Sequence, residues 1–166
     1  MLFRSGLGSP YLFPKFAIVD PELIVSMPKN LTAATGFDVL AHAIEAYTSK
    51  QSTPFTDLMS EQALRLVGRY LRRAYEKGED IEARTGMALA DTYSGFSIAV
   101  AVVTLCHAIS HVVGGLFETV HGETLAALTP HTMRYSMEFD REKLPGLSWT
   151  FKNYCRRTSP LPMVLR

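Results

Sequence analysis

Residues 31–47 read LTAATGFDVLAHAIEAY, and this stretch decides the class of fold. Its apolar side chains recur every three or four residues, which is the spacing of one helix face. The residues of this face are Leu40, Ala43, Ile44 and Tyr47. Thr32 can cap the helix, because its hydroxyl can accept a hydrogen bond from a backbone N–H of the first turn. The pattern predicts a helix from Thr32 to about Thr48.

Two further helices are predicted directly after this one. Thr53 and Pro54 provide a cap and a first-turn proline for a long amphipathic helix that ends near Lys77 and Gly78. Asp80 can cap the next helix, whose many small residues allow close contact with its neighbours. The middle of the chain is therefore predicted to be helical throughout.

Two more helices are predicted in the second half. Residues 105–113 form a helix that closes at Gly114 and Gly115, and a loop then carries residues 118–121. Gly122 opens the last helix, which reaches about Met137 and is expected to be kinked or divided by Pro130. The longest apolar run, residues 98–105, is far shorter than the roughly 20 residues that span a bilayer, and it predicts a buried helix.

The two ends of the chain differ from the middle in residue composition and in periodicity. Residues 1–30 contain several prolines and glycines and two short β-like runs, at 16–20 and 23–25, so we expect an extended N-terminal segment. Residues 31–139 are predicted to be one helical domain. Residues 140–166 have little periodicity and are predicted to be a poorly specified tail. The expected fold class is mainly α, a helical bundle preceded by a short extended segment.

Composition limits the kinds of partner. The 166 residues are 47% hydrophobic and 20% charged, with a net charge of +1, as is ordinary for a globular domain. The basic residues are scattered, so we expect neither nucleic acid nor a membrane as partner. Cys106 and Cys155 form no Cys-x-x-Cys pair and the first residues lack a signal peptide, which favours the cytoplasm.

Acidic and histidine residues form a pattern typical of a metal site. Asp38 and His42 are four residues apart, so both side chains leave one face of the first helix. His107 and His111 repeat this spacing on a later helix, and His121 follows in a segment that can fold back toward them. Together these side chains can meet one ion, although a lone Asp-x-x-x-His pair is a weak signal.

Ordinary structural roles are open for each of these residues. Asp38 and His42 can form a simple ion pair, His107 can be a satisfied core histidine, and His121 can cap the helix that follows. These roles leave unexplained why imidazoles gather in alanine- and valine-rich helices, where an unpaired polar ring costs roughly 1–3 kcal/mol to bury. A shared cation removes that cost. His131 has no second ligand at helical spacing and is expected to be structural or exposed.

Two segments resemble signatures of the iron-containing, group III, alcohol dehydrogenases. The first comprises AIVDPEL at 17–23 and LTAATGFDVLAHAIEAY at 31–47. The second comprises CHAISHVVGG at 106–115 and VHGE at 120–123. The resemblance extends over residues 13–135, and it implies the helical C-terminal domain of that family.

The resemblance also implies a set of site residues. By position, Asp38, His42, His107 and His121 match the metal ligands of the family, and His111 matches a histidine near the nicotinamide, a candidate catalytic proton relay. The implied metal is Fe(II), with Zn(II) equally suited to the ligands. The implied reaction interconverts an alcohol and an aldehyde with NAD(P). Cofactor-binding residues are unknown, because residues 1–31 contain no glycine-rich phosphate loop.

Because residues 1–31 contain no phosphate-binding loop, three interpretations of the chain are open. The chain is the metal-binding part of an alcohol dehydrogenase, whose small alcohol or aldehyde substrate needs a cofactor domain, for example on a separate chain. Alternatively, it is a non-catalytic metal-binding remnant, or part of a metal-dependent lyase of the dehydroquinate-synthase type. Activity of the chain alone is doubtful, because hydride transfer needs a fixed nicotinamide. Apolar faces left uncovered would favour a homo-oligomer.

Overall fold

The computed structural model describes residues 9–136, 138 and 143. Five α-helices follow one another in this part of the chain: α1 (Lys29–Thr48), α2 (Pro54–Glu76), α3 (Ile81–Ala101), α4 (Leu105–Phe117) and α5 (His121–Ser136). Two short 3-10 helices, η1 (Pro10–Leu12) and η2 (Pro21–Ile24), precede them. The predicted mainly α fold and helical bundle are confirmed.

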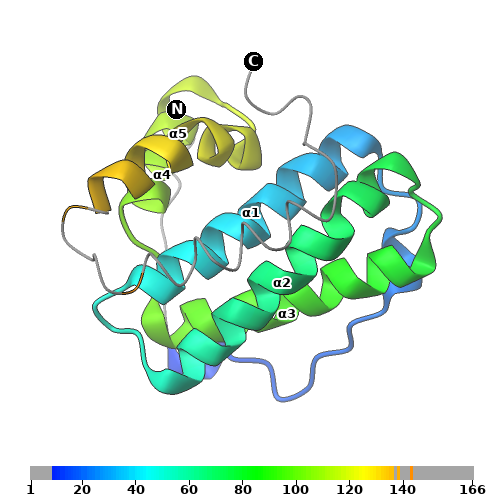
Figure 1. The fold of residues 1–166 in the computed structure, drawn as a ribbon, viewed down its shortest axis with the longest axis horizontal. Coiled ribbons are helices and arrows are strands. Elements are labelled where there is room, and N and C mark those ends of the chain that lie inside the picture. The colour runs from blue at the N-terminus through cyan, green and yellow to red at the C-terminus, as the bar shows by residue number, and fades with distance from the viewer. Residues whose placement is uncertain (1–8, 137, 139–142, 144–166) are drawn as a thin grey trace.

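Helix α1 is the centre of the bundle. It contacts each of the other four α-helices, and Figure 1 shows it between the α2–α3 pair and the α4–α5 pair. On one side, Val39 and Ile44 belong to the buried clusters shared with α2 and α3. On the other side, Ala41 packs with Cys106 of α4 and Leu125 of α5. Because two sides of α1 are covered, most of its residues are small or apolar.

Helices α2 and α3 begin as the sequence predicts and pack tightly. Thr53 forms a capping box with Thr56 at the start of α2, and Asp80 accepts a hydrogen bond from the backbone N–H of Ala83 at the start of α3. Gly86 lies against the ring of Tyr70, where an added Cβ would be 2.1 Å from a ring carbon. The two helices can approach this closely because position 86 lacks a side chain.

The N-terminal part differs from the prediction in two places. Helix α1 begins at Lys29, one turn before Thr32, which is buried within the helix and accepts a hydrogen bond from Arg84. Leu23 and Ile24, expected to be extended, lie in η2, because Asp20 caps this turn through the N–H of Glu22 and Pro21 occupies its first position.

The junction of α3 and α4 also differs. The apolar run 98–105, expected to be one buried helix, contains the end of α3 at Ala101 and the start of α4 at Leu105, and the two helices are bent by 100°. Within the described residues, no helix by itself combines the length and the apolar character that a membrane span requires. The bent α3–α4 pair meets that criterion by length and composition, as buried core helices of other proteins also do.

Two predictions for the last helices are wrong, and of the two outcomes expected at Pro130 the structure excludes division of the helix. Helix α4 does not close at Gly114 and Gly115 but continues to Phe117, and the left-handed residue after it is Glu118, with φ 54° and ψ 34°. His121 is the first residue of α5 rather than a loop residue. Pro130 lies inside α5 without dividing it.

Most of the predicted tail, with Trp149 and Phe151, lies outside the described residues. Lys143 is described, and its ammonium lies 2.8 Å from a carboxylate oxygen of Asp57 at the start of α2.

Candidate metal centre

Helix α1 supplies two residues on the side that faces α4 and α5. Asp38 and His42 lie one turn apart, with 3.4 Å between Asp38 Oδ1 and His42 Nε2. Burial lowers the pKa of His42 to about 4, although the nearby charge of Asp38 opposes this shift. The His42 ring is therefore neutral near pH 7, which is the form that binds a metal.

Helix α4 supplies His107 from the interior. Its side chain is only 2% exposed, and its Nε2 lies 3.2 Å from Asp38 Oδ1. Burial alone would lower the pKa of His107, but the hydrogen bonds to Asp38 and Glu45 outweigh it and raise the pKa to about 9. The same contacts hold the pKa of Asp38 below its usual value despite burial.

Helix α5 contributes His121, its first residue. The Nε2 atom of His121 lies 3.8 Å from Asp38 Oδ1, and its ring packs at 61° to the ring of His107. The approach of α5 to α1 depends on Gly122, which lies against the backbone at Ala34. Three helices therefore direct side chains toward one carboxylate oxygen.

The donor atoms of this cluster fit a transition-metal ion. One ligand atom each from Asp38, His107 and His121 lie within 4.8 Å of one another. His42 is not part of this compact group, but its Nε2 lies beside the same Asp38 oxygen and its ring stacks on that of His107. One carboxylate and up to three imidazoles form a donor set that suits Fe(II) or Zn(II).

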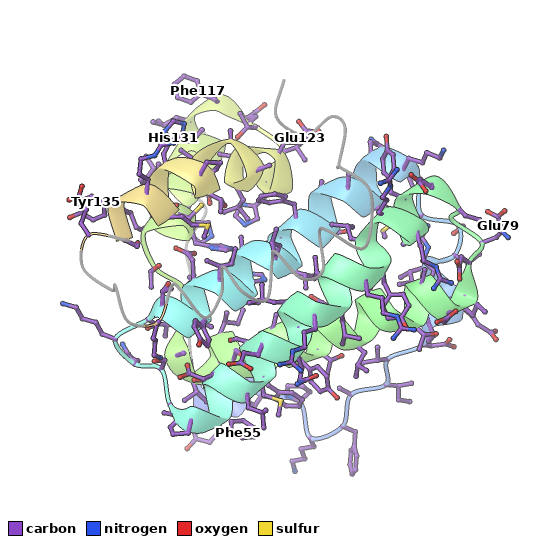
Figure 2. All side chains as sticks on the ribbon, in the orientation of Figure 1. Phe55, Glu79, Phe117, Glu123, His131 and Tyr135 are labelled. Carbon is purple, nitrogen blue, oxygen red and sulfur yellow. The ribbon has the colours of Figure 1, made fainter. Side chains whose placement is uncertain are left out.

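The two remaining histidines have different surroundings. His111 is exposed one turn after His107, and its ring centroid is 5.5 Å from that of His121. It therefore lies beside the cluster without belonging to its compact group. His131 is exposed on α5, as predicted, and Figure 2 shows it with Phe117 and Tyr135 along the outer side of the α4–α5 pair.

Glu45 is a buried carboxylate on α1 beside the cluster. It follows His42 by three residues, and this spacing predicts a structural role or a contact with a metal ligand rather than a catalytic role. The structure places its buried carboxylate against His107 Nδ1. The signal in the sequence is its position on the same helix face as Asp38 and His42, but only the packing of α4 on α1 identifies its partner.

Comparison with known proteins identifies the origin of this arrangement. Residues 32–159 match the profile described as the Fe-containing alcohol dehydrogenase family, C-terminal. The chain belongs to the iron-containing alcohol dehydrogenase family. The match covers more than half of the chain and contains every residue of the cluster.

Relatives of this family resemble the chain over most of its length. It is 46% identical over 135 residues to the NAD-dependent methanol dehydrogenase of Bacillus methanolicus, covering 81% of the chain and 35% of that enzyme. It is 40% identical over 149 residues to the choline dehydrogenase of Bacillus subtilis, covering 90% of the chain and 37% of that enzyme.

Solved structures agree with this assignment. An iron-containing alcohol dehydrogenase from Thermotoga maritima superposes with a TM-score of 0.80 at 31% identity, covering 88% of the chain and 41% of that protein. The chain thus spans about two fifths or less of each of these three relatives. It corresponds to the helical C-terminal part of the family.

Proposed function

We propose that this chain is the metal-binding part of an enzyme that interconverts a small alcohol and an aldehyde with NAD(P). The observation that carries the proposal is the cluster at Asp38 Oδ1, where the Nε2 atoms of His107, His42 and His121 lie at 3.2, 3.4 and 3.8 Å. These four residues would hold Fe(II) or, alternatively, Zn(II).

The chemistry follows from the surroundings of this cluster. A bound Fe(II) or Zn(II) ion supplies Lewis acidity, which lowers the pKa of an alcohol hydroxyl and favours loss of its proton. His107 is buried while His111 is exposed, so the site has a closed interior and an open side. An imidazole nitrogen of His111 can accept a proton on that open side and pass it to solvent.

The names of the relatives support the substrate class. One is an NAD-dependent methanol dehydrogenase and another a choline dehydrogenase, which are enzymes named for small primary alcohols. We therefore propose a small alcohol as substrate and a nicotinamide as hydride acceptor. We propose that the nicotinamide-binding residues lie outside the described residues, either elsewhere in the same enzyme or on a separate chain.

Two further expectations accompany the proposal. Val112, Leu116 and Phe117 are 61%, 62% and 71% exposed along α4, and we expect another domain or a second copy of the chain to cover them. We propose the cytoplasm as compartment, because Cys106 is a buried free thiol and the sequence contains only one other cysteine.

Metal content measured by elemental analysis tests the proposal. The purified protein is expected to contain about one iron or zinc ion per chain, and Asp38→Ala, His107→Ala and His121→Ala are each expected to lose it. His131→Ala is the matched control, because it removes an exposed histidine outside the cluster and should keep the metal. Circular dichroism verifies that each variant is folded.

Two results would contradict the proposal. A folded wild-type chain that binds neither iron nor zinc would mean that the cluster is not a metal site. Bound metal without alcohol-dependent reduction of NAD(P), measured at 340 nm on the enzyme together with its cofactor-binding part, would favour the non-catalytic alternative.

A further inference from the structure

Glu45 is a buried carboxylate that contacts the first residues of α4. Its side chain is 7% exposed and lies on the α1 face that also carries Asp38. Its Oε1 accepts hydrogen bonds from the Thr104 hydroxyl at 2.6 Å and from the backbone N–H of Cys106 at 2.7 Å. Its Oε2 accepts a hydrogen bond from the backbone N–H of His107 at 3.3 Å and also contacts His107 Nδ1.

These contacts give α4 a cap that belongs to another helix. Thr104 occupies the N-cap position but makes no side-chain capping bond of its own. The first N–H groups of a helix need acceptors, and a negative charge at this end is favourable. The Glu45 carboxylate meets both needs from α1 and thereby holds the start of α4 against the metal-binding helix.

The contact to the imidazole has a separate consequence. Each ring nitrogen of a neutral histidine is either a donor or an acceptor, and the partner of one nitrogen decides the role of the other. With Glu45 accepting at Nδ1, that nitrogen keeps its proton, so a metal ion bound to the neutral ring would take Nε2, the nitrogen that lies beside Asp38. A carboxylate at the far nitrogen of a metal-binding histidine fixes the ring and raises its basicity.

We propose that Glu45 is the positioning residue of the metal centre, holding His107 in the orientation and tautomer in which Nε2 is the ligand atom. This inference rests on the proposed metal site and adds a residue to it. Glu45 itself has no contact with the ion in this role. Its effect on the ion passes through His107, so loss of the carboxylate is expected to weaken metal binding in addition to removing the cap of α4.

The experiment compares Glu45→Gln with Thr104→Val in Zn(II) titrations against a competing chelator. Glu45→Gln keeps the size of the side chain but removes its charge, and we expect Zn(II) affinity to fall about 10- to 100-fold. Thr104→Val removes a hydrogen bond to the same carboxylate without touching the imidazole, and its Zn(II) affinity should stay within about threefold of wild type, well inside that 10- to 100-fold loss. Thermal unfolding of the metal-free proteins reports the capping role separately.

A second measurement needs no variant. In the Zn(II)-loaded wild-type protein labelled with ¹⁵N-histidine, we expect His107 to show a protonated Nδ1 and a coordinated Nε2. Coordination through Nδ1 would overturn the inference, and so would equal Zn(II) affinity of Glu45→Gln and wild type, or an equal loss in Glu45→Gln and Thr104→Val. Failure of the wild-type chain to bind Zn(II), Fe(II) or Co(II) would instead overturn the proposed function itself.

Discussion

Gly122 of α5 lies directly against the backbone of α1 at Ala34, where a Cβ at position 122 would be 2.0 Å from the Ala34 carbonyl oxygen. His121 immediately precedes this glycine, and Asp38 follows Ala34 by one helical turn. The contact between the two backbones therefore brings the His121 ring to Asp38. A side chain at position 122 would separate the two helices at this point.

We expect Gly122→Ala to lower both stability and metal affinity. The added methyl group forces α5 away from α1, which costs about 1–3 kcal/mol or more for overpacking against rigid backbone, and it displaces His121. Thermal unfolding and Co(II) titration measure the two effects. Gly95→Ala is the control, because nothing lies within 4 Å of its added Cβ and alanine favours a helix by up to about 1 kcal/mol. Wild-type behaviour of Gly122→Ala would contradict the close packing of α5 on α1 at this position.

Val102→Gly is expected to stabilise the protein. Val102 ends α3 with φ 57° and ψ 171°, a region that β-branched residues rarely adopt and that costs on the order of 1–3 kcal/mol. Glycine removes this strain, and its greater freedom in the unfolded chain offsets up to about 1 kcal/mol of the gain.

The measurement for Val102→Gly is the urea midpoint, which should rise. Val103→Gly is the matched control, because Val103 is not among the residues with positive φ, and it should lower the midpoint. An equal decrease in both variants would show that the backbone at Val102 is not strained.

Arg84→Met is expected to destabilise the protein by on the order of 2–3 kcal/mol. The guanidinium of Arg84 is buried and donates to the carbonyls of Gly78 and Met27 and to the hydroxyl of Thr32. Methionine fills the space but leaves these oxygens without their donors, and the segment before α1 loses its connection to α3.

Chemical denaturation of Arg84→Met tests this role. Arg65→Met is the control, because Arg65 is 40% exposed and its ion pair with Glu61 is worth little, so its change should stay within about 0.5 kcal/mol. A similar loss in both variants would argue against a special role of Arg84.

We expect Asp80 to stabilise the folded protein to an extent that depends on pH. The backbone N–H of Ala83 and the guanidinium of Arg73 hold the pKa of the Asp80 carboxyl below its usual 3.8 in the folded protein. Because the pKa is lower in the folded than in the unfolded state, the ionised carboxylate stabilises the fold at pH values above the unfolded pKa. This stabilisation is lost as the pH falls through the folded pKa. Asp80→Ala should therefore have a lower unfolding midpoint than wild type near neutral pH.

The difference between wild type and Asp80→Ala should shrink as the pH falls below 3.8. Asp80→Asn separates the two causes, because asparagine can still cap α3 but cannot pair with Arg73 as an anion. Urea unfolding at several pH values measures all three proteins. A difference that is constant with pH would mean that the charge of Asp80 contributes nothing.

Local sequence signals predicted the helices well where caps and periodicity agree. Thr53 and Asp80 begin α2 and α3 as expected, because capping depends on neighbouring residues alone. The signals failed where distant contacts compete with them. Thr32 looks like a cap but is buried inside α1, since Arg84 supplies its partner, and Gly114 does not end α4, since Glu118 takes the left-handed position.

For the site, the spacing Asp38-x-x-x-His42 determined which residues share a helix face, because helical geometry alone places them one turn apart. Spacing also indicated His107, His111 and His121 as partners of this pair, and the resemblance to the family then implied that Asp38, His42, His107 and His121 are the ligands, which remains a prediction. Only the tertiary structure decided that His121 reaches Asp38 and that Glu45 supports His107. These contacts depend on the close approach at Gly122 and on the bend after Ala101, and such long-range packing has no counterpart in local residue spacing.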